Sequence, residues 1–212
     1  KTNGALSDLR VIEYGNMVSG PFCARLLADS GAQVIKIESQ SGDDSRFRGP
    51  YQDDIQDPEW SALFLYLNSN KRGMTLDLEN ESGTQIFHDL LKQADILVVN
   101  HPVSTIERLK LRYDHLKSVN DKLIVTLITP FGLTGPYSSY LGDDIIALAS
   151  GGHMYSTPGL PDMIRDPLNE PPLRPNTYLG EFVSGLHATN GTMAALFRRM
   201  TTDQGCEVDV SQ

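Results

Sequence analysis

The residues with the clearest chemical potential lie where predicted strands give way to loops. Gly15 and Gly20 bracket a turn after a short strand, and Pro21 suits the first turn of the helix that follows. A ligand at such a turn meets backbone N–H groups and a helix N-terminus, which together bind anions. Asn100 and His101 follow a second strand, where polar residues line a site more often than they cap a turn. The sequence therefore predicts a ligand site at the ends of these strands.

The other reactive side chains carry weaker signals. The turn lacks the GxGxxG pattern, so the dinucleotide fingerprint is absent. Cys23 has apolar neighbours and no accompanying base, which indicates a packing thiol and not a nucleophile. The five histidines, at positions 88, 101, 115, 153 and 187, form no HxxxH or HxxE pattern, so no metal site is predicted.

Alternating strand and helix signals predict the elements that must position these residues. Strands are expected near residues 10–14, 33–37, 74–78, 96–100 and 123–128. Asn80 is expected to cap a helix that begins at Glu81. Near-continuous apolar runs such as LIVTLI are typical of parallel strands covered on both faces. We therefore predict an α/β fold, a Rossmann-like parallel sheet with helices on both faces.

The sequence changes character after residue 129. A Gly/Pro loop at residues 130–137 follows the LIVTLI strand, at the end where doubly wound folds bind ligands. A helical segment at 143–150 leads into a Pro-rich connector within residues 150–178, whose length indicates a lid, a crossover or a partner contact. Residues 179–200 give the strongest helix pattern, and residues 206–210 predict a last strand. The apolar face of that helix needs a partner surface and carries Leu186, Met193, Leu196 and Phe197.

Composition bounds the class of protein. The 212 residues carry 27 acidic and 18 basic side chains, a net charge of −9, which argues against a nucleic-acid binder. An anionic small ligand stays compatible, because it needs only a few placed cations. No apolar run approaches the ~18 residues of a membrane span. Two cysteines make no disulfide framework, which indicates a reducing compartment: the cytoplasm, or a mitochondrion or peroxisome in a eukaryote.

Several segments carry a family resemblance when they are taken in order. They are LSDLRVIEYGNMVSGPFCARLLADSGAQVIKIE from residue 6, the 68–72 run before GMTLDL, ADILVVNHPVSTIERL, FGLTGPY, DDIIA with SGG, and LGEFVSGLHATNGTMAALFRRMTTDQGCEVDVSQ. Each is weakly specific alone, whereas the ordered set over residues 6–212 is specific. The chain resembles the class III coenzyme A transferases, a family that also contains carnitine-CoA transferases, formyl-CoA transferases and alpha-methylacyl-CoA racemases.

The resemblance implies a fold and an assembly. Family members are roughly twice as long as this chain, so residues 1–212 would be the Rossmann-like, CoA-binding N-terminal large domain. A second domain and a C-terminal return segment would be absent, as in a fragment or a protein that lost its second half. Two chains of the family interlock. We therefore expect a homodimer, or pairing with the missing half, because apolar surface is otherwise left open.

The resemblance also implies a carboxylate nucleophile. The family carries an Asp after a Gly at the start of the long helix, and the matching pair here is Gly180 and Glu181. The carboxylate attacks an acyl-CoA thioester, CoA thiolate opens the resulting anhydride, and a second acid takes the CoA. Glu181 retains this chemistry at a helix N-terminus, although its extra methylene moves the attacking oxygen by about 1 Å. The alternative is that Glu181 is an ordinary first-turn acid.

Acyl-CoA and a carboxylic acid are the implied substrates, with no tightly bound cofactor. The phosphates of CoA need cations and backbone N–H groups. By family position the CoA-binding residues are Asn16, Met17, Val18, Asn70, Lys71, Arg72, Asn100, His101 and Arg108. The alternative for Lys71, Arg72 and Arg108 is that they are solvated surface charges.

Two alternatives to a transferase stay open. The first is a non-catalytic CoA-binding subunit that pairs with an active partner, and the second is a different Rossmann-like enzyme, which the absent GxGxxG disfavours. Racemisation is disfavoured as well, because Asp143 stands where the racemases carry a His. His153 fits a loop residue better than a relocated base.

Overall fold

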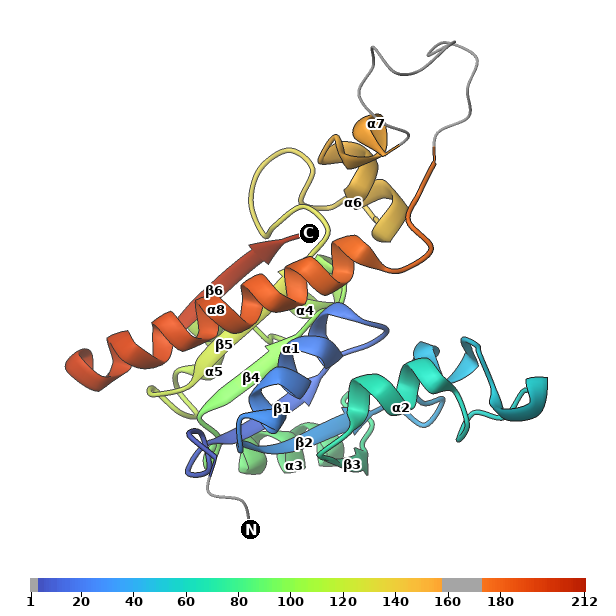
Figure 1. The fold of residues 1–212 in the computed structure, drawn as a ribbon. Helices are drawn as coiled ribbons and strands as arrows, with labels where there is room; N and C mark the ends of the chain where they lie inside the picture. Colours follow the sequence, from blue (N-terminus) through green and yellow to red (C-terminus); the bar gives the residue numbers. More distant parts are fainter. Residues whose placement is uncertain (1–3, 158–172) are drawn as a thin grey trace.

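A six-stranded, all-parallel sheet forms the centre of the molecule (Figure 1). The computed structural model describes residues 4–157 and 173–212. The strands are β1 (Arg10–Tyr14), β2 (Gln33–Glu38), β3 (Lys71–Thr75), β4 (Ile96–Val99), β5 (Ile124–Thr129) and β6 (Cys206–Ser211). Their order is β3-β2-β1-β4-β5-β6, which is a doubly wound arrangement. The predicted parallel α/β sheet is confirmed.

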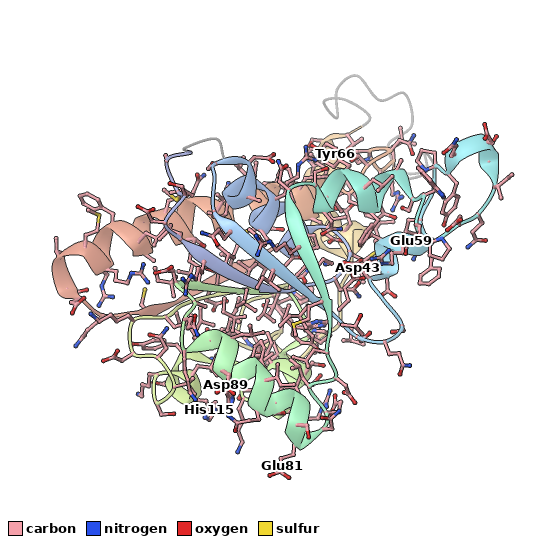
Figure 2. The ribbon with its side chains drawn as sticks, turned by 90° about the horizontal axis from the view of Figure 1, so that it is seen from below. Asp43, Glu59, Tyr66, Glu81, Asp89 and His115 are labelled. Atoms are coloured by element: carbon pink, nitrogen blue, oxygen red, sulfur yellow. The ribbon has the colours of Figure 1, made fainter. Side chains whose placement is uncertain are left out.

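Helices cover both faces of this sheet, as predicted (Figure 1). One face packs against α1 (Ser19–Asp29) and α8 (Leu179–Thr202). The other face packs against α3 (Glu81–Leu91), α4 (Val103–Arg108) and α5 (Tyr113–Leu116). Figure 2, seen from below, shows Glu81 and Asp89 of α3 and His115 of α5 on the side of the sheet opposite Tyr66. Because every residue of β4 and β5 is buried, these strands need an apolar cover on each side.

The remaining elements are short. They are η1 (Asp44–Phe47), η2 (Gln52–Asp54), α2 (Ala62–Asn68), α6 (Asp144–Ser150) and α7 (His153–Ser156). Asn80 caps α3 as predicted, because its side chain accepts a hydrogen bond from the N–H of Gly83. Most of the Pro-rich connector falls on residues 158–172, which lie outside the described residues.

One predicted strand is misplaced. The alternation of GMTLDL predicts a strand over residues 74–78, whereas β3 covers Lys71–Thr75 and pairs Val34 with Lys71. This register lets the Lys71 ammonium lie 2.6 Å from a carboxylate oxygen of Glu13 in β1. Leu76 and Leu78, the apolar residues of the pattern, follow the strand and pack with the core under α3. Their alternation therefore reflects burial beyond the strand and not β structure.

The sheet has its topological switch point between β1 and β4. The chain leaves β1 toward β2 on one side, and leaves β4 toward β5 on the other. The loops that follow the two neighbouring strands therefore diverge and leave a crevice at their carboxyl ends. Residues 15–18 and Asn100 lie at this crevice.

Close packing of α8 on α1 brings the start of the long helix to the same crevice. A Cβ atom at Gly185 would lie 2.6 Å from the carbonyl oxygen of Ser19 and 3.2 Å from a ring carbon of Phe22. Only glycine allows the two helices to approach this closely. Gly185 therefore sets the distance between the first turns of α1 and α8.

The first prediction concerns this contact. Gly185→Ala should lower the free energy of unfolding by about 1–3 kcal/mol, because the new methyl group forces the helices apart. Gly73→Ala is the matched control, since nothing lies within 4 Å of a Cβ there, and its effect should stay within about 0.5 kcal/mol. Urea unfolding of both variants measures the difference. Equal stabilities would contradict the close approach.

Candidate active site

The carboxylate of Glu181 lies on the N-terminus of α1. Its Oε2 accepts hydrogen bonds from the N–H groups of Val18 and Ser19, each at 3.1 Å. Glu181 itself belongs to the first turn of α8 and is 7% exposed. The first turn of α1 has no acidic residue of its own, so Glu181 supplies the negative charge that a helix N-terminus favours. Val18 and Glu181 are 163 positions apart in the chain.

Asn100 holds the loop that presents these N–H groups. Its Oδ1 accepts from the N–H of Asn16 at 2.7 Å, and its Nδ2 donates to the carbonyl of Asn16 at 2.7 Å and to the hydroxyl of Ser19 at 2.9 Å. A Cβ atom at Gly20 would meet Oδ1 of Asn100 at 2.7 Å. Gly20, which suggested a turn in the sequence, is therefore needed for the close approach of Asn100. The side chain of Asn100 holds the loop in place through its hydrogen bonds and does not project freely into the crevice.

Two acids of α6 stand beside Glu181. The Oδ1 of Asp144 accepts the backbone N–H of Glu181 at 3.1 Å, so Asp144 caps α8 across the interface between the helices. Asp144 is 2% exposed, and its Oδ2 is buried without a hydrogen bond among the described residues. Asp143 caps α6 by accepting the N–H of Ile146.

Burial raises the pKa of Glu181 to about 7. The two N–H donors of α1 oppose the shift, while the negative charges of Asp144 and Asp143 add to it. Near neutral pH the side chain therefore exists in both protonation states. A carboxylate with this pKa is a stronger base than an exposed glutamate and still ionises at neutral pH.

A cavity of about 200 Å³ opens beside Glu181. Its lining residues are Asn16, Met17, Asn100, Pro102, Val103, Ser104, Pro130, Ser138, Ser139, Tyr140, Leu141, Gly142, Asp143, Glu181 and Gln212. Segments after β1, β4 and β5 all contribute, as expected at the carboxyl edge of a parallel sheet. The structure therefore brings four of the predicted site residues together here: Asn16, Met17, Asn100 and Glu181, with Val18 adjacent.

The predicted cations lie elsewhere. Arg72 and Asn70 line a larger hollow, of about 440 Å³, beside the amino ends of β1 and β2. Arg108 forms an exposed ion pair with Glu79 and lines a separate hollow of about 300 Å³. The ammonium of Lys71 is buried among Glu13, the carbonyl of Pro21 and the side chain of Asn68. The hollow near Arg72 is larger than the cavity beside Glu181, but Glu181 does not line it, so we take the smaller cavity as the candidate active site.

His101 does not supply a positive charge. Its ring lies 4.4 Å from the ring of Tyr14, measured between centroids. Burial, and then the nearby Lys36 ammonium, lowers the pKa of His101 to about 4. The imidazole is therefore neutral at physiological pH and can contribute packing or a hydrogen bond. The CoA-binding roles of His101 and of the cations stay predictions.

Sequence reasoning gave no role to Asp144, nor to Glu13, Lys36 and Asp43, which form a buried group of four charges with Lys71. A signal for the second was present, because Glu13 and Lys36 interrupt otherwise apolar strands, RVIEY and QVIKIE. Charged residues on a buried face of a strand must be paired. Within the described ranges, 4–157 and 173–212, no group of side chains is placed to hold a metal ion, and no helix is long and apolar enough to cross a membrane.

Comparison with known proteins identifies the family. A sequence profile of CoA-transferase family III matches residues 6–212, nearly the whole chain. The chain belongs to this family. Among solved structures, a CAIB/BAIF family protein from Brucella suis has a TM-score of 0.87 and 31% identity, over 99% of this chain and 53% of its own.

Curated relatives are CoA-transferases of several specificities. The chain is 34% identical to formyl-CoA:oxalate CoA-transferase of Streptomyces avermitilis, over 98% of this chain and 47% of the relative. It is 35% identical to acetyl-CoA:oxalate CoA-transferase of Acetobacter aceti, over 100% of this chain and 51% of the relative. It is 32% identical to succinate–glutarate CoA-transferase of Agrobacterium fabrum, over 97% of this chain and 50% of the relative. The chain thus spans about half the length of the curated relatives it matches.

The second prediction concerns the ionisation of Glu181. Between pH 4.5, the ordinary pKa of a glutamate, and about 7, the folded protein keeps a proton that the unfolded chain has lost. Stability should therefore fall as pH rises through this window, by about 3 kcal/mol at most for this group. Glu181→Gln removes the effect, so the variant should gain stability relative to the parent as pH rises from 4.5 to 7.

Unfolding free energies of both proteins across this pH range test the expectation. Glu81→Gln serves as the control, because Glu81 is likewise a first-turn acid but is exposed. Its curve should run parallel to that of the parent. A parallel curve for Glu181→Gln would instead mean that burial does not shift this carboxyl.

Proposed function

We propose that this chain is the nucleophile-bearing part of a CoA transferase, which moves coenzyme A between carboxylic acids through Glu181. Family membership over residues 6–212 supports the class of reaction. The observation that carries the proposal is the placement of the Glu181 carboxylate, buried beside a cavity, with Oε2 bound to two N–H groups. Oε1 has no hydrogen bond among the described residues and is the oxygen that attacks.

The reaction begins when Oε1 attacks the thioester carbonyl of an acyl-CoA. The C–S bond breaks, which leaves a mixed anhydride on Glu181 and CoA thiolate. The thiolate then attacks the glutamyl carbonyl carbon, which releases the donor acid as a carboxylate and leaves a glutamyl-CoA thioester. The acceptor carboxylate attacks this thioester, and the returning thiolate takes the new acyl group, so that Glu181 is regenerated.

The N–H groups of Val18 and Ser19 have a second use in these steps. Attack at the glutamyl carbonyl carbon puts negative charge on Oε2, the oxygen that already faces both donors. Fixed donors aimed at an oxygen that gains charge lower the barrier, because they need no reorganisation. The α1 N-terminus therefore acts as an oxyanion hole for the glutamyl carbonyl of the mixed anhydride and of the glutamyl-CoA thioester.

We further propose that CoA lies across the carboxyl edge of the sheet, with its nucleotide end toward the exposed guanidinium of Arg108. The neighbouring hollow lined by Phe87, His88 and Leu109 could take an apolar or aromatic group. Arg108 suits a phosphate better than Lys71, because its ion pair with Glu79 is exposed, whereas the Lys71 ammonium is buried against Glu13. Acyl-CoA and carboxylic acid are then substrates, and no tightly bound cofactor is required.

Unpaired Cys23 and Cys206 support a reducing compartment such as the cytoplasm.

The third prediction tests the nucleophile. Incubation of the intact protein with an acyl-CoA and hydroxylamine should place a hydroxamate, detected by mass spectrometry, on Glu181. Glu181→Gln should lose at least about 10²-fold in transfer rate, because an amide oxygen is a poor nucleophile. Glu81→Gln should transfer CoA at the parental rate. CoA binding without any hydroxamate would favour the alternative, a non-catalytic CoA-binding subunit.

A fourth prediction concerns assembly, which we propose is a homodimer or a pairing with further residues of the protein. Near the end of α8, Phe197 is 74% exposed and Met200 is 82% exposed, which is costly for large apolar side chains in water. The 212-residue chain should therefore self-associate, with an unfolding midpoint that rises with concentration. Phe197→Ser with Met200→Ser should weaken association.

Sedimentation at several concentrations measures this association. Ile55→Ser is the control, because Ile55 is 69% exposed in a different part of the surface. A monomer that unfolds cooperatively at a concentration-independent midpoint would show that α8 needs no partner.

A further inference from the structure

Four buried charges form one cluster beneath the loop that follows β1. The ammonium of Lys36 lies 2.8 Å from Oε1 of Glu13 and 2.7 Å from Oδ2 of Asp43. The ammonium of Lys71 lies 2.6 Å from Oε2 of Glu13. All four side chains are almost fully buried. Two positive and two negative charges balance, which is the condition under which buried ions are tolerated.

Three members of the cluster also bind the backbone of the loop. Lys36 donates to the carbonyl of Gly15 at 3.1 Å, and Lys71 donates to the carbonyl of Pro21 at 2.8 Å. The Oδ1 of Asp43 accepts the N–H of Met17 at 3.1 Å. The chain is thus anchored at two positions before Val18 and Ser19, whose N–H groups hold Glu181, and at one position after them.

The contact with Asp43 falls at the most demanding position of the loop. Met17 has a φ of 57°, in the left-handed region that L-residues other than Asn and Asp rarely adopt. It immediately precedes Val18, so its conformation sets the direction of the next two N–H groups. Asp43, which is labelled in Figure 2, lies in the acidic segment after β2, residues 39–58. The next residue, Asp44, exchanges two hydrogen bonds with Asn16, at 2.7 and 2.8 Å.

We propose that the buried charge cluster positions the Val18 and Ser19 N–H groups for Glu181, which makes Asp43 and Lys36 positioning residues of the active site. Neither touches Glu181. Each acts through the backbone of residues 15–18, and the acidic segment after β2 acquires a function that its composition does not suggest. The consequence for reactivity rests on the proposed function, whereas the consequence for the ionisation of Glu181 does not.

Other charged residues lie near Glu181 and near the buried charge cluster. Asp143 and Asp144 face Glu181 from α6, and their charges raise its pKa. Around the cluster stand Glu38, which accepts the backbone N–H of Asp43, and Asp44, which is hydrogen-bonded to Asn16. His101 lies there as well, and burial, followed by the charge of Lys36, lowers its pKa. No charged group of α1 takes part in the hydrogen bonds to Glu181 in the described part of the chain.

In Asp43→Ala, the direction in which the pKa of Glu181 shifts distinguishes a positioning role of Asp43 from a direct effect of its charge. Removing a negative charge can by itself only lower the pKa of Glu181. Releasing Met17 lets the Val18 and Ser19 N–H groups turn away, and the loss of these donors raises the pKa. We expect a rise of about one unit, measured by NMR titration of the glutamate Cδ signals in the intact protein, with the Glu181 signal assigned by its loss in Glu181→Gln.

Asp43→Asn is the matched control. It removes the same charge but keeps an oxygen that can accept the N–H groups of Met17 and Ser45, so the pKa of Glu181 should stay or fall. Hydrogen exchange at Val18 and Ser19 should quicken in Asp43→Ala and not in Asp43→Asn. If Asp43→Ala does not fold, Asp43→Ser replaces it, because a hydroxyl can still cap η1.

The outcomes decide the proposal. A pKa that falls or stays in Asp43→Ala, with unchanged exchange at Val18 and Ser19, would overturn it. A rise with faster exchange supports it, and a fall in kcat with KM little changed would extend that support to catalysis. The pKa result holds whether or not the protein transfers CoA, so failure of the proposed function is detected separately, by the absence of a hydroxamate on Glu181.

Discussion

The hydrogen bonds from Val18 and Ser19 to Glu181 are the interaction on which the other features of the site depend. They join the first loop of the chain to its last long helix. They require the switch point between β1 and β4, the close contact of α1 with α8 at Gly185, and a loop held by Asn100 on one side and buried charges on the other. The three helices also cap one another in sequence: Asp144 of α6 binds the N-terminus of α8, and Glu181 of α8 binds that of α1.

Burial and contacts with oppositely acting groups shift the pKa of Glu181, Lys71 and Lys36 in opposite directions. Burial raises the pKa of Glu181, and the α1 donors limit the rise to about 7. Burial lowers the pKa of Lys71 to about 8, although Glu13 opposes it. For Lys36 burial acts first in the same direction, but Glu13 and Asp43 together overcome it and raise the pKa. Lys36 contacts two carboxylates and Lys71 only one, and the positive charge of Lys36 also lowers the pKa of Lys71.

Much of the fold could be predicted from local sequence, and less of the site. Apolar runs such as those of β4 and β5 indicated a doubly covered parallel sheet, and Asn80 marked the start of α3, because these signals lie within a few residues of their effect. The family resemblance, and not spacing, pointed to Glu181. The register of β3, the charge cluster and the cap from Asp144 could not be predicted, because each depends on residues that meet only after the sheet has formed.

In the function that we propose, Glu181 stands where the family resemblance implies an aspartate nucleophile, and these contacts suit the longer side chain. The longer side chain could swing between several rotamers, and a nucleophile that moves by about 1 Å loses much of its rate. Here the backbone of Glu181 is fixed by Asp144 and one carboxylate oxygen is fixed by two N–H groups. With the backbone and Oε2 both held, the added methylene changes the path of the side chain, and Oε1 can move only as far as rotation of the held carboxylate allows. In the proposed enzyme the placement of the carboxylate then depends on the loop at residues 15–18, and therefore on the buried charges that hold the backbone of this loop.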